Sequence, residues 1–246
     1  MLEISSASNS LYKRLLSLTE AKGLKKEKSF LLSGKNLVQE HLKNPKLSLE
    51  SEIFTEGMKP STSVKFQIKM SKALFETLDV LGTHSPLLVL QQPEIPEWDF
   101  EKKHQGLQLL LPVGDPANLG AAIRSAEAFG VENVILLKES AHPFLPKAVK
   151  ASAGSITRVC LFRGPSIQAL KDPEILALDL KGTNLSDFHW PENGYLLGGE
   201  EGAGLPAGSK FRRLSIPTNQ VESLNATVAL SIALFHYSQR PKRKKS

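Results

Sequence analysis

The spacing of apolar residues over the first 92 positions predicts a small unit in which strands alternate with helices. Short apolar or alternating runs indicate strands at 29–34, 48–54, 64–70 and 86–92. Apolar residues recur at helical spacing in the segments that we predict as helices, 9–22, 35–44 and 71–80. Gly23 and Pro45 are expected to end the first two helices, and Ser71 to cap the third.

A second series of strands and helices begins at residue 107. LQLLLPV (107–113) is a continuous apolar run, which is typical of a parallel strand buried on both faces. Further strands are predicted at 131–137, 158–162, 174–180 and 212–217, with another running into a glycine-rich loop at 194–206. Helices are predicted at 118–130, 143–154, 166–172 and 222–239. This order predicts an α/β domain.

The two regions are separated by PEIPEWDFEKKHQG (93–106), whose prolines and charges are typical of a linker. We therefore expect an N-terminal domain at 1–96, a linker at 97–106, a second domain at 107–239 and a basic tail at 240–246.

The length of 246 residues suits one large domain or two modest ones, and 41% hydrophobic residues suit a globular core. The single cysteine, Cys160, excludes an internal disulfide and a multi-cysteine zinc site. The sequence predicts no signal peptide and no membrane span. We expect a soluble, cytoplasmic protein.

The net charge of +6 is concentrated in short segments. Without the tail RPKRKKS the remaining chain carries a charge of only +1, and a second basic cluster, KGLKKEKS, lies at 22–29. Such clusters suit contact with phosphates, although a solvated terminus and a solvated loop are the alternative for each. The candidate RNA-binding residues are Lys25, Lys26, Arg240, Lys242, Arg243, Lys244 and Lys245.

The first candidate motif, PVGDPANLGAAIRSAEAFG (112–130), leads from a strand through a polar turn into a helix. Free N–H groups at a helix N-terminus can bind a ligand, and Gly120 permits close approach. Asn118 stands near the expected cap, and Arg124 lies about 1.7 helical turns further on. Alternatively, Arg124 is a surface residue that pairs with Glu127.

The second motif, GGEEGAGLP (198–206), is a glycine-rich loop after a predicted strand. A loop with so few Cβ atoms can hold a ligand through its backbone, and a flexible turn is the alternative. It does not match the dinucleotide fingerprint, which follows the first strand of a βαβ unit and opens a helix.

The third motif, IPTNQVESLNATVAL (216–230), places polar residues between a strand and an apolar helix. Ser223 and Asn225 straddle the expected first turn of that helix. The simplest alternative is that Ser223 is the N-cap and that Glu222 interacts with the helix dipole.

Several other kinds of site are not indicated. The six histidines are scattered without a paired spacing, and the sequence contains no zinc-protease, nucleophile-elbow or Walker motif. We therefore expect no metal. Trp98 and Trp190 are isolated and are expected to be packing residues.

Together, NLGAAIRSAEAFG, LLGGEEGAGLP and IPTNQVESLNATVALSIALF resemble, in order and spacing, the three motifs of the SpoU or TrmH-type RNA ribose 2′-O-methyltransferases of the SPOUT superfamily. The resemblance covers roughly residues 107–239. The N-terminal region, through KSFLLSGKNLVQEHL and LGTHSPLLVL, resembles the L30e-like substrate-binding domain that is frequent in this family.

The resemblance implies a fold of two α/β parts, a small L30e-like domain and a SPOUT domain with a parallel sheet and a deep trefoil knot. It also implies bound S-adenosylmethionine, a homodimer with the active site at the interface, and methylation of a ribose 2′-hydroxyl in structured RNA. We favour 23S ribosomal RNA as the target over transfer RNA. A non-catalytic RNA-binding protein on the same fold is a second alternative. A Rossmann methyltransferase is disfavoured, because PVGDPANLG lacks the glycine pattern.

The resemblance also implies roles for individual residues. Arg124 matches the catalytic arginine. Asn118, Glu201, Ser223 and Asn225 are the further candidate catalytic residues, and Gly199, Gly202, Ile216 and Leu224 are the candidate contacts to the methyl donor. One departure concerns the turn after Ile216-Pro217, where the family usually has Met followed by a glycine-containing loop. Here Thr218 replaces the Met, TNQ is one residue shorter and lacks the glycine, and NAT replaces a serine-rich ending.

Overall fold

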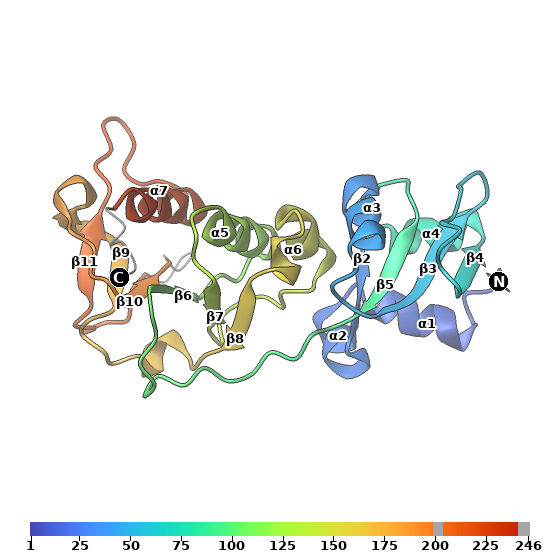
Figure 1. Cartoon of the computed structure of the whole chain (residues 1–246), viewed down its shortest axis with the longest axis horizontal. Coiled ribbons are helices and arrows are strands. Elements are labelled where there is room, and N and C mark those ends of the chain that lie inside the picture. The colour runs from blue at the N-terminus through green and yellow to red at the C-terminus, as the bar shows by residue number, and fades with distance from the viewer. Residues whose placement is uncertain (199–203, 241–246) are drawn as a thin grey trace. The chain divides into compact units, whose positions relative to one another are not determined.

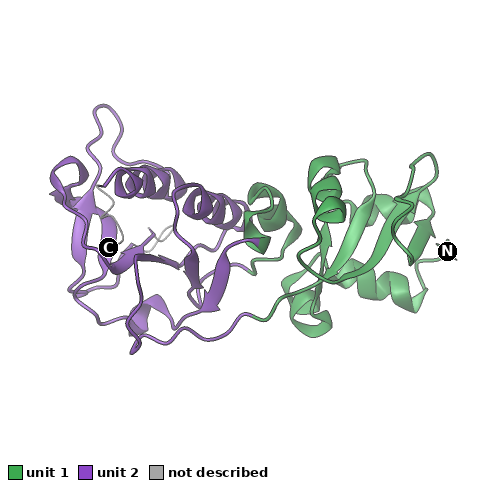
Figure 2. Ribbon diagram, in the orientation of Figure 1, with its two compact units in different colours: residues 1–94, 142–157 green, residues 95–141, 158–246 purple. Residues whose placement is uncertain are grey.

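The computed structural model describes residues 1–198 and 204–240. The chain forms two compact units (Figure 2): unit 1 contains residues 1–94 and 142–157, and unit 2 contains residues 95–141 and 158–246. Unit 1 thus includes a segment that lies far from its main part in the sequence.

Unit 1 is built on a five-stranded mixed sheet in the order β1-β4-β3-β5-β2 (Figure 1). Its strands are β1 (Leu2–Ile4), β2 (Ser29–Leu32), β3 (Leu49–Thr55), β4 (Gln67–Met70) and β5 (Leu87–Gln91). β4 runs parallel to β1 and β3, whereas β5 runs antiparallel to β2 and β3. Four of these strands were predicted. β1 was not, because its three residues are too few to show a periodic pattern.

The helices of unit 1 follow the predicted alternation. They are α1 (Ser10–Ser17), α2 (Ala21–Glu27), α3 (Lys35–Lys43), α4 (Lys72–Leu78) and α6 (Pro146–Ala151). The prediction of one helix that ends at Gly23 was wrong, since Gly23 is buried inside α2. A Cβ at Gly23 would lie 1.9 Å from the backbone oxygen of Ser17, so glycine permits α2 to pack closely against the end of α1.

Unit 1 is completed by residues 142–157, which carry α6 and the 3₁₀ helix η1 (Ser155–Thr157). The Phe144 side chain is fully buried, and its ring centroid lies 4.7 Å from that of Phe30 on β2. The predicted boundary at residue 96 therefore leaves out part of the core of this unit.

Unit 2 contains a six-stranded sheet in which every strand is parallel to its neighbours, in the order β11-β9-β10-β6-β7-β8 (Figure 1). The strands are β6 (Leu107–Leu111), β7 (Asn133–Leu136), β8 (Cys160–Arg163), β9 (Leu176–Asn184), β10 (Gly194–Leu197) and β11 (Arg212–Ser215). All five residues of β6 are buried, as its continuous apolar run predicts. The predicted α/β fold with a parallel sheet is confirmed, and the trefoil knot stays a prediction.

Two long helices of unit 2, α5 (Pro116–Ala128) and α7 (Ala226–Ser238), lie side by side along the sheet (Figure 1). The Oγ atoms of Ser125 on α5 and Ser231 on α7 are 2.8 Å apart. Two shorter 3₁₀ helices, η2 (Ile167–Ala169) and η3 (Leu185–Asp187), complete the unit, and η2 replaces the longer helix predicted at 166–172.

The segment predicted as a linker packs against unit 2. Trp98 is buried in the core of this unit, and its indole N–H donates to the Tyr195 hydroxyl at 3.1 Å. Glu97 forms a parallel bridge with Arg163 at the end of β8. Residues 95–106 thus belong structurally to unit 2, because Trp98 provides an apolar anchor that the prolines and charges around it obscure.

Candidate active site

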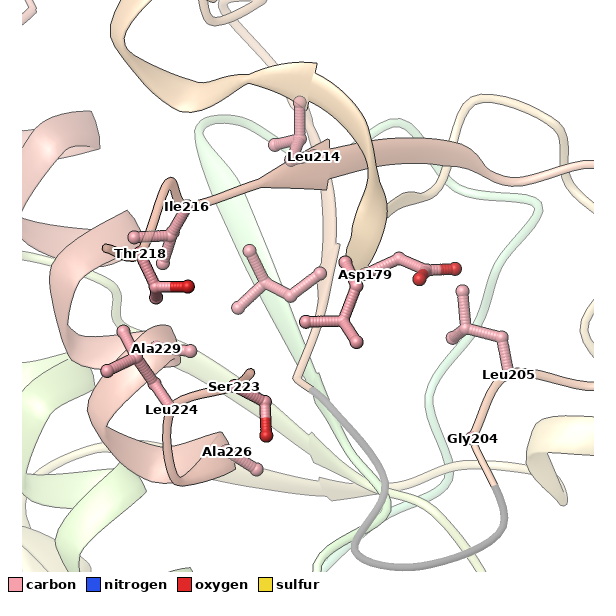
Figure 3. A pocket seen from close by; sticks show the side chains of 12 residues that line it. Asp179, Gly204, Leu205, Leu214, Ile216, Thr218, Ser223, Leu224, Ala226 and Ala229 are labelled. Atoms are coloured by element: carbon pink, nitrogen blue, oxygen red, sulfur yellow. The ribbon is translucent and has the colours of Figure 1, made fainter. Parts of the chain in front are cut away.

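A pocket of about 410 Å³ opens in unit 2 between the middle of β9 and the loop that follows β11 (Figure 3). Its walls are mostly aliphatic, and its volume is in the range of small-molecule sites. The lining residues are Leu178, Asp179, Leu180, Gly204, Leu205, Leu214, Ile216, Thr218, Ser223, Leu224, Ala226 and Ala229. Ligands of open parallel sheets bind at the carboxyl ends of the strands. The pocket lies in the region where a ligand of this fold is expected.

An irregularity in β9 shapes one wall of the pocket. Ala177 of β9 pairs with Arg213 of β11, but the next residue of β11, Leu214, pairs with Thr183. Residues 178–182 lie between these two pairings, and the first three of them line the pocket. Such a bulge changes the direction of the side chains on the strand.

Three side chains bring polar groups to this apolar pocket. The Thr218 hydroxyl donates to the carbonyl of Val221 at 2.7 Å and so stabilises the short turn after Ile216-Pro217. The Asp179 carboxylate forms an ion pair with Arg213. The Ser223 side chain is exposed, and the structure gives its hydroxyl no hydrogen-bond partner among residues 1–198 and 204–240. Ser223 and Asp179 can therefore both contact a ligand.

Three residues predicted from the third motif, Ile216, Ser223 and Leu224, all line this pocket. In the second motif, Gly199, Glu201 and Gly202 lie outside the described residues. Sequence reasoning missed the contribution of β9, which supplies Leu178, Asp179 and Leu180. The one signal for it was an acidic residue within the apolar run EILALDL.

Asn225 caps the N-terminus of α7. Its Oδ1 accepts hydrogen bonds from the backbone N–H groups of Thr227 at 2.9 Å and Val228 at 3.2 Å. Ser223 lies before the helix, so the alternative that Ser223 is the cap was wrong. The candidate catalytic residue Asn225 thus also has a structural role.

We expect Asn225→Ala to lower the free energy of unfolding by about 1 kcal/mol, the usual cost of losing an N-cap. Asn225→Ser should keep most of this stability, because serine also caps helices well. Chemical denaturation of both variants checks the cap, and their rates of reaction check the second role. Equal stability of the alanine variant and the wild type would contradict the capping role.

The residues of the first motif lie at the start of α5. Asp115 is the N-cap and accepts a hydrogen bond from the backbone N–H of Asn118 at 2.8 Å, so the helix begins earlier than predicted. Arg124 is exposed on the same helix. Glu127, its expected partner, forms a bidentate pair with Arg158 at 2.6 and 2.9 Å instead. The structural alternative for Arg124, pairing with Glu127, therefore loses its support.

The candidate RNA-binding residues fall into two groups. Lys25 and Lys26 are exposed on α2. Arg240 is half-buried over the Tyr237 ring, with its guanidinium carbon 3.5 Å from the ring centroid, and burial lowers the pKa of its side chain. The other four, Lys242, Arg243, Lys244 and Lys245, lie outside the described residues.

Residues 1–198 and 204–240 contain no cluster of three or more His, Cys, Asp or Glu side chains that could hold a metal ion. Among the same residues, no helix is long and apolar enough to cross a membrane.

Residues 108–235, about half of the chain, match the SpoU rRNA Methylase family. The chain is 41% identical to ribosomal RNA small subunit methyltransferase G 2 of Syntrophobacter fumaroxidans, over 96% of this chain but 49% of that protein. It therefore spans only about half the length of that relative. It is 30% identical to RlmP of Bacillus subtilis, a 23S rRNA guanosine 2′-O-methyltransferase, over 96% of this chain and 99% of that protein.

Solved structures have the same fold. A TrmH-family protein from Porphyromonas gingivalis, 28% identical, matches with a TM-score of 0.71 over 94% of this chain and 98% of that one. The SpoU methyltransferase AviRb from Streptomyces viridochromogenes, solved with AdoMet, matches with a TM-score of 0.78 over 94% and 97%, at 22% identity. With three sequence motifs, a parallel sheet and a full-length relative in agreement, the chain belongs to the SpoU rRNA methylase family.

Proposed function

We propose that this protein transfers the methyl group of S-adenosylmethionine to a ribose 2′-hydroxyl of structured RNA, with 23S ribosomal RNA as the favoured target. The observation that carries the proposal is the pocket, since Ile216, Ser223 and Leu224 of the third SpoU motif line it together. RlmP, matched over 99% of its length, is a 23S rRNA 2′-O-methyltransferase and supports the choice of RNA. A cytoplasmic location is part of the proposal.

The pocket fits the chemistry of the donor. Its aliphatic side chains suit the adenine ring, and Asp179 and Ser223 offer hydrogen-bonding groups for the sugar or the amino acid. The backbone at Ile216 and Leu224 is proposed to contact the donor, as are Gly199 and Gly202 of the glycine-rich loop. Bound S-adenosylmethionine supplies an electrophilic methyl group.

The remaining task is to position the RNA hydroxyl and to stabilise charge. In the overall reaction the bond between the methyl group and sulfur would break, S-adenosylhomocysteine would leave, and the proton of the 2′-hydroxyl would pass to solvent. Negative charge develops on the 2′ oxygen as its O–H bond breaks. The Arg124 guanidinium can stabilise this charge. A guanidinium holds its protons too tightly to be a good proton acceptor. Asn118, Glu201, Ser223 and Asn225 are proposed to orient the hydroxyl and the donor.

The direct test uses purified protein, methyl-labelled S-adenosylmethionine, and ribosomal and transfer RNA in separate reactions. We expect label in ribosomal RNA, at linkages that resist alkaline cleavage because the 2′ oxygen is blocked. Label in transfer RNA alone would show that transfer RNA, and not ribosomal RNA, is the target. Binding of RNA without transfer of the methyl group would show that the protein is a non-catalytic RNA-binding protein.

Filling part of the pocket should weaken binding of the donor. Ala229 lines the pocket, and Ala229→Leu adds bulk to its wall. We expect the affinity for S-adenosylmethionine to fall at least about tenfold, in line with the cost of overfilling a packed site. Calorimetry measures this. Ala73→Leu, at an exposed position of α4, is the matched control and should bind normally. Unchanged affinity of Ala229→Leu would show that the donor binds elsewhere.

We also propose that the protein is a homodimer that associates through α5 and α7. An open, largely apolar groove of about 450 Å³ lies between these helices and is lined by Ala121, Ser125, Thr227, Val228, Ser231, Ile232 and Phe235. Val228, Ile232 and Phe235 are exposed although they are large and apolar, and such a patch marks an interaction surface. A second copy would cover it.

Phe235→Glu should therefore weaken the dimer. We expect its dissociation constant to rise about 30-fold or more, as for the loss of a hot-spot contact worth about 2 kcal/mol. Sedimentation over a range of concentrations measures it. Phe66→Glu is the control, because Phe66 of unit 1 is 48% exposed and Phe235 is 52% exposed. Equal effects of both changes, or a monomeric wild type, would rule this interface out.

The RNA is proposed to contact the basic clusters. Lys25 and Lys26 on α2, Arg240, and the tail residues Lys242, Arg243, Lys244 and Lys245 would bind phosphates without reading sequence. The affinity should therefore depend strongly on salt concentration.

A further inference from the structure

Twelve residues of the described part of the chain line the pocket of unit 2, and Asp179 is the charged one among them. The proposed reaction leaves open whether Asp179 meets the sugar or the amino acid of the donor. Asp179 lies on β9, opposite the motif residues Ser223 and Leu224 that line the other side (Figure 3). A carboxylate beside aliphatic walls is costly unless hydrogen bonds or a cation compensate it. The presence of Asp179 at this pocket therefore indicates a polar contact with the ligand, which an apolar residue could not make.

Asp179 is held in place by two neighbours. Its Oδ2 lies 2.8 Å from the Nη1 atom of Arg213 on β11, and its Oδ1 accepts the backbone N–H of Lys181 at 3.2 Å. A carboxylate has about four lone-pair positions on its two oxygens. The two contacts occupy half of them, so the group can still accept hydrogen bonds from a ligand.

An irregular stretch of backbone carries Asp179 at the edge of the pocket, where its carboxylate points toward Leu205 (Figure 3). The register shift between β9 and β11 places Asp179 in the stretch that leaves the regular pairing. Gly182 closes this stretch, and a Cβ there would lie 2.5 Å from the carbonyl carbon of Arg213. Glycine is therefore required for β9 to return to β11 at this distance.

We propose that Asp179 binds the ribose hydroxyls of the methyl donor and so helps to select an adenosyl ligand. The inference rests on the proposed function, since it concerns the donor of that reaction. Three groups of the donor could donate hydrogen bonds to a carboxylate: the neutral ribose hydroxyls, the cationic ammonium and the amino group of adenine. Arg213 already compensates the charge of Asp179 and would repel a second cation close by. Hydroxyl groups donate hydrogen bonds to the free lone pairs and leave the ion pair intact.

The test measures binding of three ligands by calorimetry. S-adenosylhomocysteine carries ribose hydroxyls and an ammonium, 5′-methylthioadenosine carries only the hydroxyls, and 2′,3′-dideoxy-S-adenosylhomocysteine carries only the ammonium. Asp179→Ala should lower the affinity for the first two ligands equally, by about ten- to a hundredfold, because each loses hydrogen bonds to a charged group. It should leave the dideoxy ligand unchanged.

Matched variants separate this contact from the stability of the fold. Asp187→Ala removes an exposed acid of η3 and should bind all three ligands normally. Arg213→Ala removes the ion pair but keeps the carboxylate, and should still distinguish ribose from dideoxyribose. If Asp179→Ala does not fold, Asp179→Asn keeps the shape and should give a smaller loss with the same ligand pattern.

Other outcomes would overturn the inference. Loss of affinity for S-adenosylhomocysteine without loss for 5′-methylthioadenosine would show that Asp179 binds the ammonium. An equal loss for all three ligands would show that it binds the amino group of adenine. Unchanged affinity for both would show that it contacts neither group, while donor binding by the wild type would leave the proposed function standing. A wild type that binds none of the ligands would overturn both.

Discussion

Replacing Arg124 by alanine should lower the rate of methyl transfer by about 10²–10³-fold, the range for removing one donor that stabilises an oxyanion. The guanidinium is exposed on α5, and Glu127 is engaged by Arg158. Its loss should therefore change neither the melting temperature nor the affinity for S-adenosylmethionine, whose proposed pocket does not include Arg124. Single-turnover methylation with saturating donor measures the effect.

Two further variants sharpen this prediction. Arg124→Lys should recover little of the rate, because an ammonium cannot reproduce the planar fork of donors. Arg163→Ala, at an exposed arginine on β8 of the same unit, should react at the normal rate. A near-normal rate for Arg124→Ala would remove the catalytic assignment. A large fall in its melting temperature would make Arg124 a structural residue.

Phe144→Ala should destabilise unit 1 by about 3–5 kcal/mol, the cost of truncating a buried phenylalanine. Phe144 is fully buried and its ring packs against Phe30 on β2, although it lies about fifty residues beyond the predicted domain boundary. Chemical denaturation measures the loss of stability, and hydrogen exchange at the backbone amides of β2 shows that the loss is in unit 1. The pocket proposed for the donor belongs to unit 2, so binding of S-adenosylmethionine should persist while unit 1 loosens.

Phe144→Leu is the matched control. It keeps a large apolar side chain, so it should destabilise unit 1 much less than Phe144→Ala does. A fragment of residues 1–96 lacks this side chain altogether and should be less stable than unit 1 in the whole protein. If Phe144→Ala left the stability unchanged, residues 142–157 would not be part of the core of unit 1.

Much of the fold could be predicted from local patterns. The buried run LQLLL predicts β6 because both faces of a parallel sheet are covered, and four strands of unit 1 appear as short apolar or alternating segments. The third motif predicts three residues that line one pocket, Ile216, Ser223 and Leu224, because they come from a single strand-to-helix connection. The order of the motifs also identifies the family.

Features that depend on distant parts of the chain could not be predicted in this way. A glycine at position 23 predicts the end of a helix, but in the structure Gly23 packs closely against Ser17 and lies inside α2. Asp179 reaches the pocket only because β9 and β11 shift register, and one strand alone carries no sign of that pairing. Likewise, Ser223 and Asn225 are equally good caps in sequence, and tertiary structure selects Asn225.

A map of 2′-O-methylation tests most directly whether this protein methylates a ribose 2′ oxygen of ribosomal RNA. Ribosomal and transfer RNA would be mapped from cells that lack the protein, from cells that carry it, and from cells that carry Arg124→Ala. We predict a modified nucleotide in 23S ribosomal RNA that requires the wild-type protein and is absent or strongly reduced with Arg124→Ala. Identical maps in all three strains would contradict the account.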